Sequence, residues 1–153
     1  MIHPQLKQLL RTRGFTLIEL LVSISIIAIL IVVISVSFTK AQKSGRDQRR
    51  MDDLKSIQSA AEQYYFLGGG YPPAIGYYRP TASAWTVNGQ IVLNKFPNDP
   101  KSINGVGITY AVTNITTNSY CICATVENTA NANSADACDF VNPSNKFCIK
   151  NQQ

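Results

Sequence analysis

Hydrophobic positions are concentrated near the start of the chain. Residues 15–38 contain no proline or glycine, are mostly aliphatic, and carry a single charge, Glu19. As a helix this segment would be roughly 36 Å long at about 1.5 Å per residue, enough to cross the hydrocarbon core of a bilayer. The pattern therefore predicts a transmembrane helix that is apolar on all sides.

The single carboxylate decides between interpretations of this helix. A secretory signal has a shorter apolar region, and a simple signal anchor has no use for Glu19. A carboxylate inside a membrane span costs about 2.5 to 3.5 kcal/mol and needs a partner, which the span does not supply. If the chain were cut between Gly14 and Phe15, the new α-amino group would lie four residues from Glu19. That amine would pair with the carboxylate of its own chain or of a neighbouring copy.

The helical pattern continues beyond the apolar segment. Residues 39–67 contain no proline and one glycine, and apolar side chains recur at helical spacing at Leu54, Ile57, Ala61 and Tyr64. This stripe predicts an amphipathic helix with a sheet docked on it. The glycines at 68–70, followed by Tyr-Pro-Pro at 71–73, predict the end of the helix.

Charged residues on this part of the helix fall at pairing distance. Three pairs have i,i+3 or i,i+4 spacing, namely Lys43 with Asp47, Arg49 with Asp53, and Asp47 with Arg50. We expect them to lie mostly on a solvated face.

Beyond residue 73 the pattern predicts β-strands. Residues 84–87 and 90–93 flank Asn88-Gly89, a strong signal for a hairpin. Residues 107–113 and 119–126 predict a second hairpin, and residues 146–150 a last strand. In the proline-bounded turn at 96–100, Asp99 is expected to bind its own backbone. We expect one antiparallel sheet of about four strands on the apolar stripe.

Charge and histidine content limit the function. The formal net charge is +5, but from Gly68 onward five basic residues stand against four acidic ones. This balance predicts no direct nucleic-acid binding. The one histidine, His3, precedes the apolar segment, so histidine-based catalysis is not expected and the chain is interpreted as a non-enzyme.

Four cysteines lie in the last third of the chain. Their number and their place beyond a membrane segment predict two disulfides, among Cys121, Cys123, Cys138 and Cys148. Cys121 and Cys123 share one face of a strand with Cα atoms about 6.6 Å apart, which disfavours a bond between them. Of the two remaining connectivities, we favour Cys123 with Cys138 and Cys121 with Cys148. A four-thiolate zinc site is the alternative, although the C-x-C spacing is not typical of one.

The start of the apolar segment carries a family resemblance. The residues Arg-Gly-Phe-Thr-Leu-Ile-Glu-Leu-Leu at 13–21 resemble the class III signal of type IV prepilins and type II secretion pseudopilins. The resemblance implies cleavage after Gly14 by a membrane aspartyl prepilin peptidase and N-methylation of Phe15. It also implies that Glu19 pairs with the Phe15 amine of an adjacent subunit during assembly.

The resemblance extends to the fold and the domains. It implies an α+β pilin fold, in which a long N-terminal helix with a protruding apolar half packs on a small antiparallel β-sheet with a disulfide-stapled C-terminal region. The expected parts are a leader at 1–14, a hydrophobic transmembrane and assembly helix at 15–38, its amphipathic continuation at 39–67, and a globular β-rich head at 68–153.

A calcium site is a further expectation in the C-terminal region. Residues 131–139 are rich in oxygen-bearing side chains, with Asp136 and Asp139 as the candidate ligands. Major pseudopilins often bind calcium in such a loop, and the resemblance raises the same idea here. Against this site, the residues match no fixed ligand pattern, and loops of this composition usually bind no metal. No cofactor other than calcium is expected.

The resemblance implies a filament subunit with defined partners. These are further copies of the chain in a helical filament, the prepilin peptidase, and an assembly platform with its ATPase. The precursor is expected in the inner (cytoplasmic) membrane as a single-pass protein, and the mature chain in an extracellular pilus or a periplasmic pseudopilus. A pilus subunit is favoured because disulfide-closed C-terminal regions are common in pilins. The alternatives are a type II secretion system major pseudopilin and a membrane-tethered binding module that never polymerises.

Overall fold

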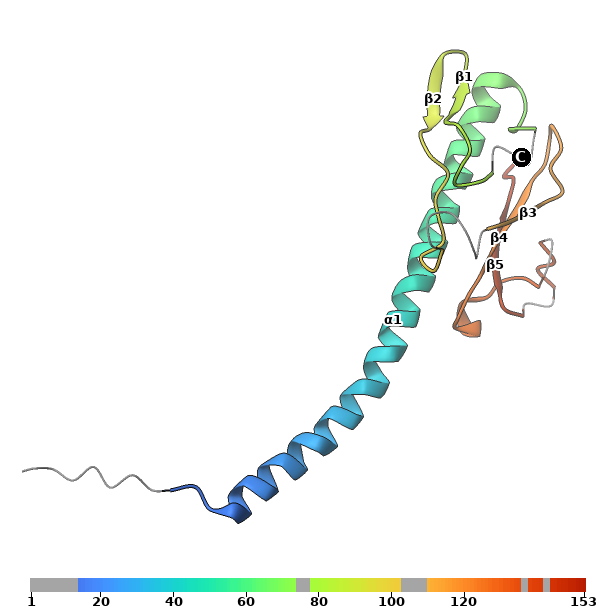
Figure 1. Ribbon diagram of the computed structural model, residues 1–153. Coiled ribbons are helices and arrows are strands. Elements are labelled where there is room, and N and C mark those ends of the chain that lie inside the picture. Colours follow the sequence, from blue (N-terminus) through green and yellow to red (C-terminus); the bar gives the residue numbers. More distant parts are fainter. Residues whose placement is uncertain (1–13, 74–77, 103–109, 136–137, 142–143) are drawn as a thin grey trace, which may run out of the picture. The chain divides into compact units, whose positions relative to one another are not determined.

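The structure is a computed structural model that describes residues 14–73, 78–102, 110–135, 138–141 and 144–153. The chain divides into two compact units, Met1–Thr39 and Lys40–Gln153. One continuous helix, α1 (Leu17–Gly68), contributes to both units (Figure 1). The helix predicted over residues 15–67 is thus confirmed, with its start two residues later and its end one residue later.

Three consecutive glycines end α1, and each meets a different requirement. Gly68 is the last helical residue, and a Cβ there would lie 2.8 Å from Cγ2 of Val87. Gly69 has a φ of 74°, and its N–H donates to the Tyr65 carbonyl at 2.7 Å, which is the left-handed stop of many helices. A Cβ on Gly70 would lie 2.6 Å from Cγ2 of Thr117. The predicted stop therefore also allows close packing of a hairpin and a loop.

The strands form two antiparallel sheets, whereas the sequence predicted one sheet of about four strands. β1 (Trp85–Val87) pairs with β2 (Gln90–Leu93) in a two-stranded sheet. The second sheet has the order β3-β4-β5, with bounds Ala111–Thr113, Cys121–Thr125 and Lys146–Lys150. All three predicted strand groups are present, and residues 107–109 of the second hairpin lie outside the described residues.

The first hairpin also completes the end of the helix. Asn88 and Gly89 have φ values of 50° and 79°, as a two-residue turn with matching twist requires. Nδ2 of Asn88 donates to the Leu67 carbonyl at 2.7 Å, so the turn supplies a hydrogen bond to a carbonyl that the ending helix leaves free. The hairpin is therefore bound to the end of α1, in addition to being stabilised by its own turn.

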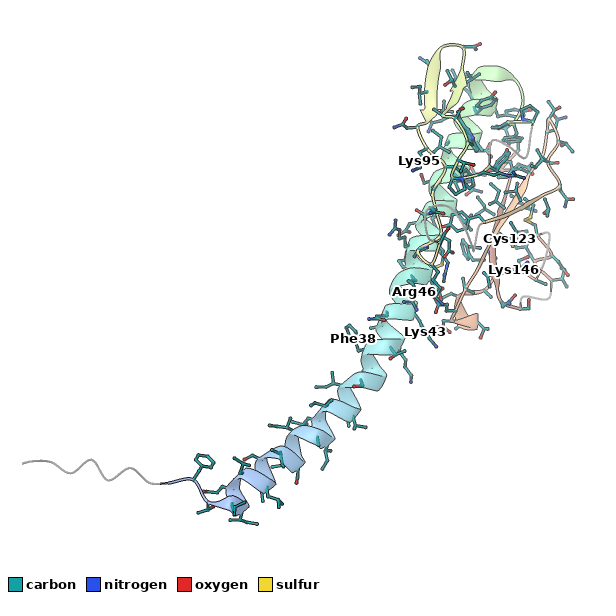
Figure 2. All side chains as sticks on the ribbon, in the orientation of Figure 1. Phe38, Lys43, Arg46, Lys95, Cys123 and Lys146 are labelled. Carbon is teal, nitrogen blue, oxygen red and sulfur yellow. A yellow bond between two sulfur atoms is a disulfide. The ribbon has the colours of Figure 1, made fainter. Side chains whose placement is uncertain are left out.

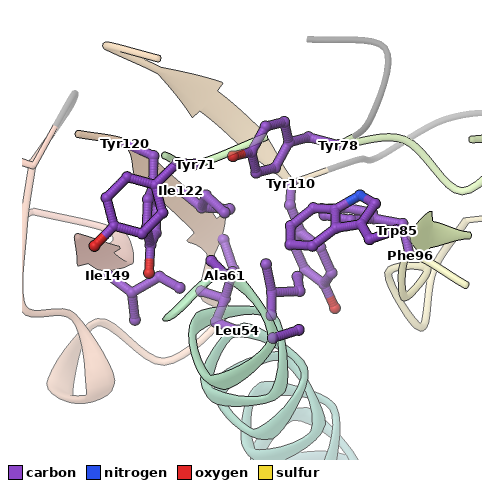
Figure 3. Packing of buried hydrophobic residues seen from close by; sticks show 13 residues of the cluster. Leu54, Ala61, Tyr71, Tyr78, Trp85, Phe96, Tyr110, Tyr120, Ile122 and Ile149 are labelled. Atoms are coloured by element: carbon purple, nitrogen blue, oxygen red, sulfur yellow. The ribbon is translucent and has the colours of Figure 1, made fainter. Parts of the chain in front are cut away.

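The core of the head lies between α1 and the strands. Leu54, Ile57 and Ala61 of the predicted stripe are fully buried, and Tyr64 packs beside them partly buried. Aromatic rings cover this stripe in edge-on contacts, with ring centres 5.0 Å apart for Tyr78 and Trp85 (Figure 3). Buried tyrosine hydroxyls find acceptors, since Tyr110 donates to Asp53 at 2.6 Å.

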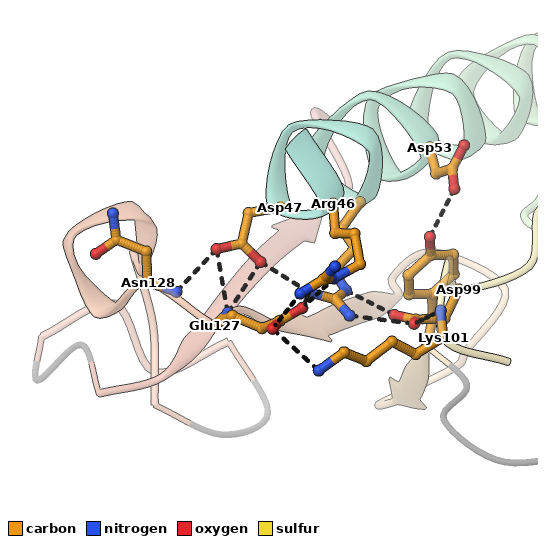
Figure 4. A network of polar contacts seen from close by, with 9 residues as sticks. Arg46, Asp47, Asp53, Asp99, Lys101, Glu127 and Asn128 are labelled. Carbon is orange, nitrogen blue, oxygen red and sulfur yellow. Dashed lines mark hydrogen bonds and ion pairs between the residues drawn. The ribbon is translucent and has the colours of Figure 1, made fainter. Parts of the chain in front are cut away.

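A buried ion network joins α1 to two distant loops (Figure 4). Asp47 and Arg50 are 0% and 1% exposed, so the expectation of a solvated face is wrong for this pair. Arg50 donates to Asp47 at 2.8 Å and to Asp99 at 2.7 Å. Asp99 also accepts the N–H of Lys101 at 2.8 Å, which confirms its predicted turn role. The helix charges are buried because the loops supply partners that no local spacing reveals.

Glu127 and Asp47 connect this network to the start of a short 3-10 helix, η2 (Thr129–Asn131). Glu127 binds Arg46 through both carboxylate oxygens, at 2.7 and 2.8 Å, and Lys101 at 3.0 Å. The Asp47 carboxylate accepts the backbone N–H groups of Glu127 and Asn128 at 2.8 to 3.1 Å. Three cations and three carboxylates are therefore matched, and they bind loop backbone as well as one another.

Candidate processing and assembly site

The first turn of α1 is organised around Glu19. Its Oε2 accepts the backbone N–H of Thr16 at 2.9 Å and the Thr16 hydroxyl at 2.8 Å. In return the N–H of Glu19 donates to Oγ1 of Thr16 at 3.3 Å. This reciprocal pattern is a capping box, in which Thr16 and Glu19 satisfy N–H groups that the start of a helix leaves free. The sequence pattern predicted only a pairing of Glu19 with a Phe15 amine, of its own chain or of a neighbouring copy, and gave Thr16 no role.

The capping box does not use the α-amino group that cleavage would create. Thr16 keeps its backbone N–H after a cut between Gly14 and Phe15, because the new terminus is on Phe15. The Phe15 side chain is 80% exposed, and with Glu19 it lines a shallow depression completed by Ile18, Val22 and Ser23. Within the described part of the chain, Oε1 of Glu19 therefore has no hydrogen-bond partner, and it lies beside Phe15, the first residue after the predicted cut.

No described residue of its own unit covers the apolar part of α1. Every described side chain from residue 15 to residue 38 is exposed (Figure 2). α1 is a helix long and apolar enough to cross a membrane, with a mean hydropathy of 3.1 over its most apolar window. Ser23, Ser25 and Ser35 donate to carbonyls four residues earlier, at 2.7 to 2.8 Å, which removes their hydroxyls as free polar groups. The surface of this segment is therefore suited to lipid or to other apolar helices.

The comparison with known families agrees with this geometry. Residues 9–35 match the family described as the prokaryotic N-terminal methylation motif. No curated protein and no solved structure matches the chain. The matched segment holds the residues of the capping box and most of the apolar run. The start of the chain is therefore similar to that of proteins that carry a class III signal.

This signal occurs in two main groups of proteins, and the motif supports a type IV pilin-like or pseudopilin protein. The motif implies processing by a prepilin peptidase and an anchored precursor in the membrane. The long helix, the small antiparallel sheets and the two C-terminal disulfides agree with the α+β pilin fold. Gly14 and Phe15 are described, whereas the rest of the predicted leader lies outside the described residues.

The four cysteines form two disulfides, but not in the pairing that the sequence favoured. Cys121 bonds to Cys138, and Cys123 bonds to Cys148. The register of β4 and β5 sets this outcome, because Cys123 and Cys148 lie directly opposite one another with Cα atoms 4.1 Å apart. The expectation that Cys121 and Cys123 do not bond to each other is confirmed.

In the described part of the predicted calcium loop, residues 131–139, two polar side chains form hydrogen bonds with the backbone. Asn133 binds the backbone of β5 through two hydrogen bonds. Its Oδ1 accepts the N–H of Cys148 at 2.7 Å, and its Nδ2 donates to the Cys148 carbonyl at 3.0 Å. Oδ1 of Asp139 accepts the N–H of Val141 at 3.0 Å. Asp136 lies outside the described residues. The calcium site stays a prediction.

Proposed function

We propose that this protein is a structural subunit of a type IV pilus-like surface filament, which polymerises through its N-terminal helix. In this proposal the prepilin peptidase cleaves between Gly14 and Phe15 and methylates Phe15. An assembly platform with its ATPase then moves the subunit from the membrane into a helical filament of identical chains. The final location of the processed subunit is an extracellular fibre.

The proposal rests on one combination, an apolar helix whose side chains are exposed and a single carboxylate that is held in a fixed position at its start. The described side chains of residues 15–38 are exposed in the single chain, so they require lipid before assembly and neighbouring helices afterwards. Glu19 is held by Thr16 in a defined position at the start of that surface. A cationic Phe15 amine from a neighbouring copy would give this carboxylate its charge partner and set the axial offset between subunits.

The disulfides support the surface pilus over the type II secretion pseudopilus. Two bonds lie within the last third of the chain, at Cys121–Cys138 and Cys123–Cys148. Disulfides persist in oxidising surroundings outside the cell and tie loops of small domains that have limited cores. Because the periplasm is oxidising as well, the preference for the pilus rests on the resemblance, since disulfide-closed C-terminal regions are common in pilins. The pseudopilin remains the second candidate, because the N-terminal motif is common to both groups.

The test is an intact-mass and N-terminal analysis of the chain in material sheared from cells, with washed membranes analysed in parallel. A chain that begins at methylated Phe15 in the sheared fraction supports the pilus subunit. The same processed chain confined to membranes supports the pseudopilin. A chain that retains the leader through Gly14 overturns processing, and the tethered binding module then becomes the better explanation.

A further inference from the structure

Two exposed lysines lie at the start of the second compact unit, where the apolar run of α1 ends. Lys40 and Lys43 follow Phe38 by two and five positions in the same helix (Figure 2). No acidic residue occurs between positions 20 and 46 of the sequence. The two ammonium groups therefore lie in a stretch of the helix that carries positive charge only.

The first carboxylate that follows, Asp47, has partners other than these lysines. Its i,i+4 spacing predicted a pair with Lys43, but the Asp47 side chain is buried and binds Arg50 at 2.8 Å. It also accepts two backbone N–H groups of the loop after β4. With the described residues, neither Lys40 nor Lys43 forms a salt bridge or a side-chain hydrogen bond. Both cations are therefore left for a partner that the described chain does not supply.

The spacing along α1 matches the layers of a membrane. As a helix, residues 15–38 rise roughly 36 Å, so they fill a hydrocarbon core of about 30 Å even when the helix is tilted. At about 1.5 Å per residue, Lys40 and Lys43 lie about 3 and about 8 Å beyond Phe38 along the helix axis. The polar headgroup layer is about 5 to 8 Å thick on each side, and lysine side chains near a helix end reach toward it. Both ammonium groups therefore fall where the lipid phosphates lie.

The two lysines also form one surface. Side chains three positions apart lie on the same side of a helix, so Lys40 and Lys43 point in similar directions. The next cation on that side, Arg46, has a partner within the chain, since it binds both carboxylate oxygens of Glu127 at 2.7 and 2.8 Å. The unneutralised charge of this stretch therefore ends with Lys43.

We propose that Lys40 and Lys43 bind the phosphate groups of anionic lipids in the leaflet opposite the leader, before the subunit is assembled. An ammonium group near an anionic leaflet is attracted to its phosphates, and salt screens this attraction. Binding would fix the depth of α1 in the membrane and would be released when the subunit leaves it. The inference rests on the membrane-anchored precursor and not on polymerisation.

The test is native mass spectrometry of the full chain, released from neutral detergent micelles that contain equal amounts of phosphatidylglycerol and phosphatidylcholine with the same acyl chains. The apolar helix contacts the tails of both lipids, so their ratio on the chain reports headgroup binding. At low salt the anionic lipid is expected in more than about tenfold excess. K40Q/K43Q should lower this ratio by about tenfold, and K40R/K43R should keep it because both charges remain.

Two controls separate these lysines from the other cations. The leader is the same in every variant, so its basic residues do not contribute to a difference between variants. K55Q/K95Q makes the same change in net charge at two exposed lysines further along the chain, and its ratio should stay within about twofold of the unaltered chain. All four lysines are exposed, and thermal unfolding should show that both double variants remain folded.

An unchanged lipid ratio in K40Q/K43Q would overturn the proposal. An equal fall in both glutamine variants would also overturn it, because the effect would then come from net charge alone. If the ratio is unchanged but less of K40Q/K43Q reaches the sheared fraction, the lysines bind carboxylates of neighbouring copies instead of lipid. Failure of the lipid test leaves the pilus proposal in place, because that proposal is tested by the processing and location of the chain.

Discussion

Nε of Arg50 donates to Oδ2 of Asp99 at 2.7 Å, and this contact joins α1 to a turn 49 positions further along the chain. Both side chains are 1% exposed, so the pair is removed from solvent. The same guanidinium binds Asp47. Burial tends to lower the pKa of Arg50, but the hydrogen bonds to Asp99 and Asp47 outweigh this effect and raise the pKa above its ordinary value. Arg50 is thus the centre of the ion network that holds the loops of the head on the helix.

Replacement of Arg50 is expected to be severely destabilising. In R50M, two buried carboxylates, Asp47 and Asp99, lose their shared cation. Breaking a buried pair on one side costs about 3 to 5 kcal/mol, and we expect a loss of that size in the free energy of unfolding. The measurement is denaturant unfolding of the full chain in detergent. The neighbouring exposed Arg49 supplies the control R49M, with an expected change within about 0.5 kcal/mol. Equal losses for the two variants would contradict the central role of Arg50.

The same network predicts a loss of stability in acid. The hydrogen bonds from Arg46 hold the pKa of Glu127 below its ordinary value of 4.5. Burial tends to raise the pKa of Asp47, but the N–H groups of Glu127 and Asn128 outweigh it and lower that pKa below 3.8. A carboxylate with a lowered pKa in the folded state stabilises the fold above its ordinary pKa, and this contribution is lost as the pH falls through the folded value. The free energy of unfolding should therefore decline below about pH 4.5.

Unfolding curves across a pH series measure this decline, and E127Q serves as the control. The glutamine cannot ionise, so the acid-dependent part of the curve should become shallower. Asp53 acts in the opposite sense, because burial raises its pKa and its ionisation disfavours the folded state. An unchanged slope in E127Q would mean that other carboxylates cause the acid sensitivity.

Two glycines of α1 should respond in opposite directions to the same substitution. At Gly45 a Cβ meets nothing within 4 Å, so G45A is expected to stabilise the helix by up to about 1 kcal/mol. At Gly68 a Cβ would lie 2.8 Å from Val87, and G68A is expected to cost about 1 to 3 kcal/mol because β1 must shift. Thermal unfolding of both variants gives the sign directly. A stabilising G68A would show that the hairpin has room to move.

Substitutions at Glu19 separate its two roles. E19A removes both the cap and the charge, whereas E19Q keeps a carbonyl oxygen for Thr16 and removes only the charge. We expect both variants to reduce the amount of this chain in the sheared fraction by more than about tenfold, because each leaves the Phe15 amine of the neighbour without a charge partner. Processed chain should remain in the membrane.

T16V completes the comparison at this site. It removes the hydroxyl that donates to Glu19 at 2.8 Å but leaves the carboxylate charged. A smaller loss of filaments than in E19A is therefore expected. Normal filament yield in E19Q would contradict pairing by charge and would assign Glu19 the capping role alone.

The sequence predicted the apolar run, the glycine stop of the helix and the hairpin turn because these features depend on near neighbours along the chain. Helical spacing places Leu54, Ile57 and Ala61 on one face wherever the helix lies, and Asn88-Gly89 favours a tight hairpin through its own backbone preferences. The match of residues 9–35 to the methylation motif rests on such a contiguous pattern. These features follow from the local chain and needed no knowledge of long-range contacts.

By itself, the sequence determined the apolar helix with its single carboxylate, the stop at the three glycines and the positions of the strands. Only the tertiary structure decided the pairing of the cysteines, the division into two sheets and the burial of Asp47 and Arg50. In each case the cause is a contact between residues that lie far apart in the sequence. The register of β4 with β5 places Cys148 opposite Cys123, and Asp99 and Glu127 arrive at the helix from loops that are distant along the chain.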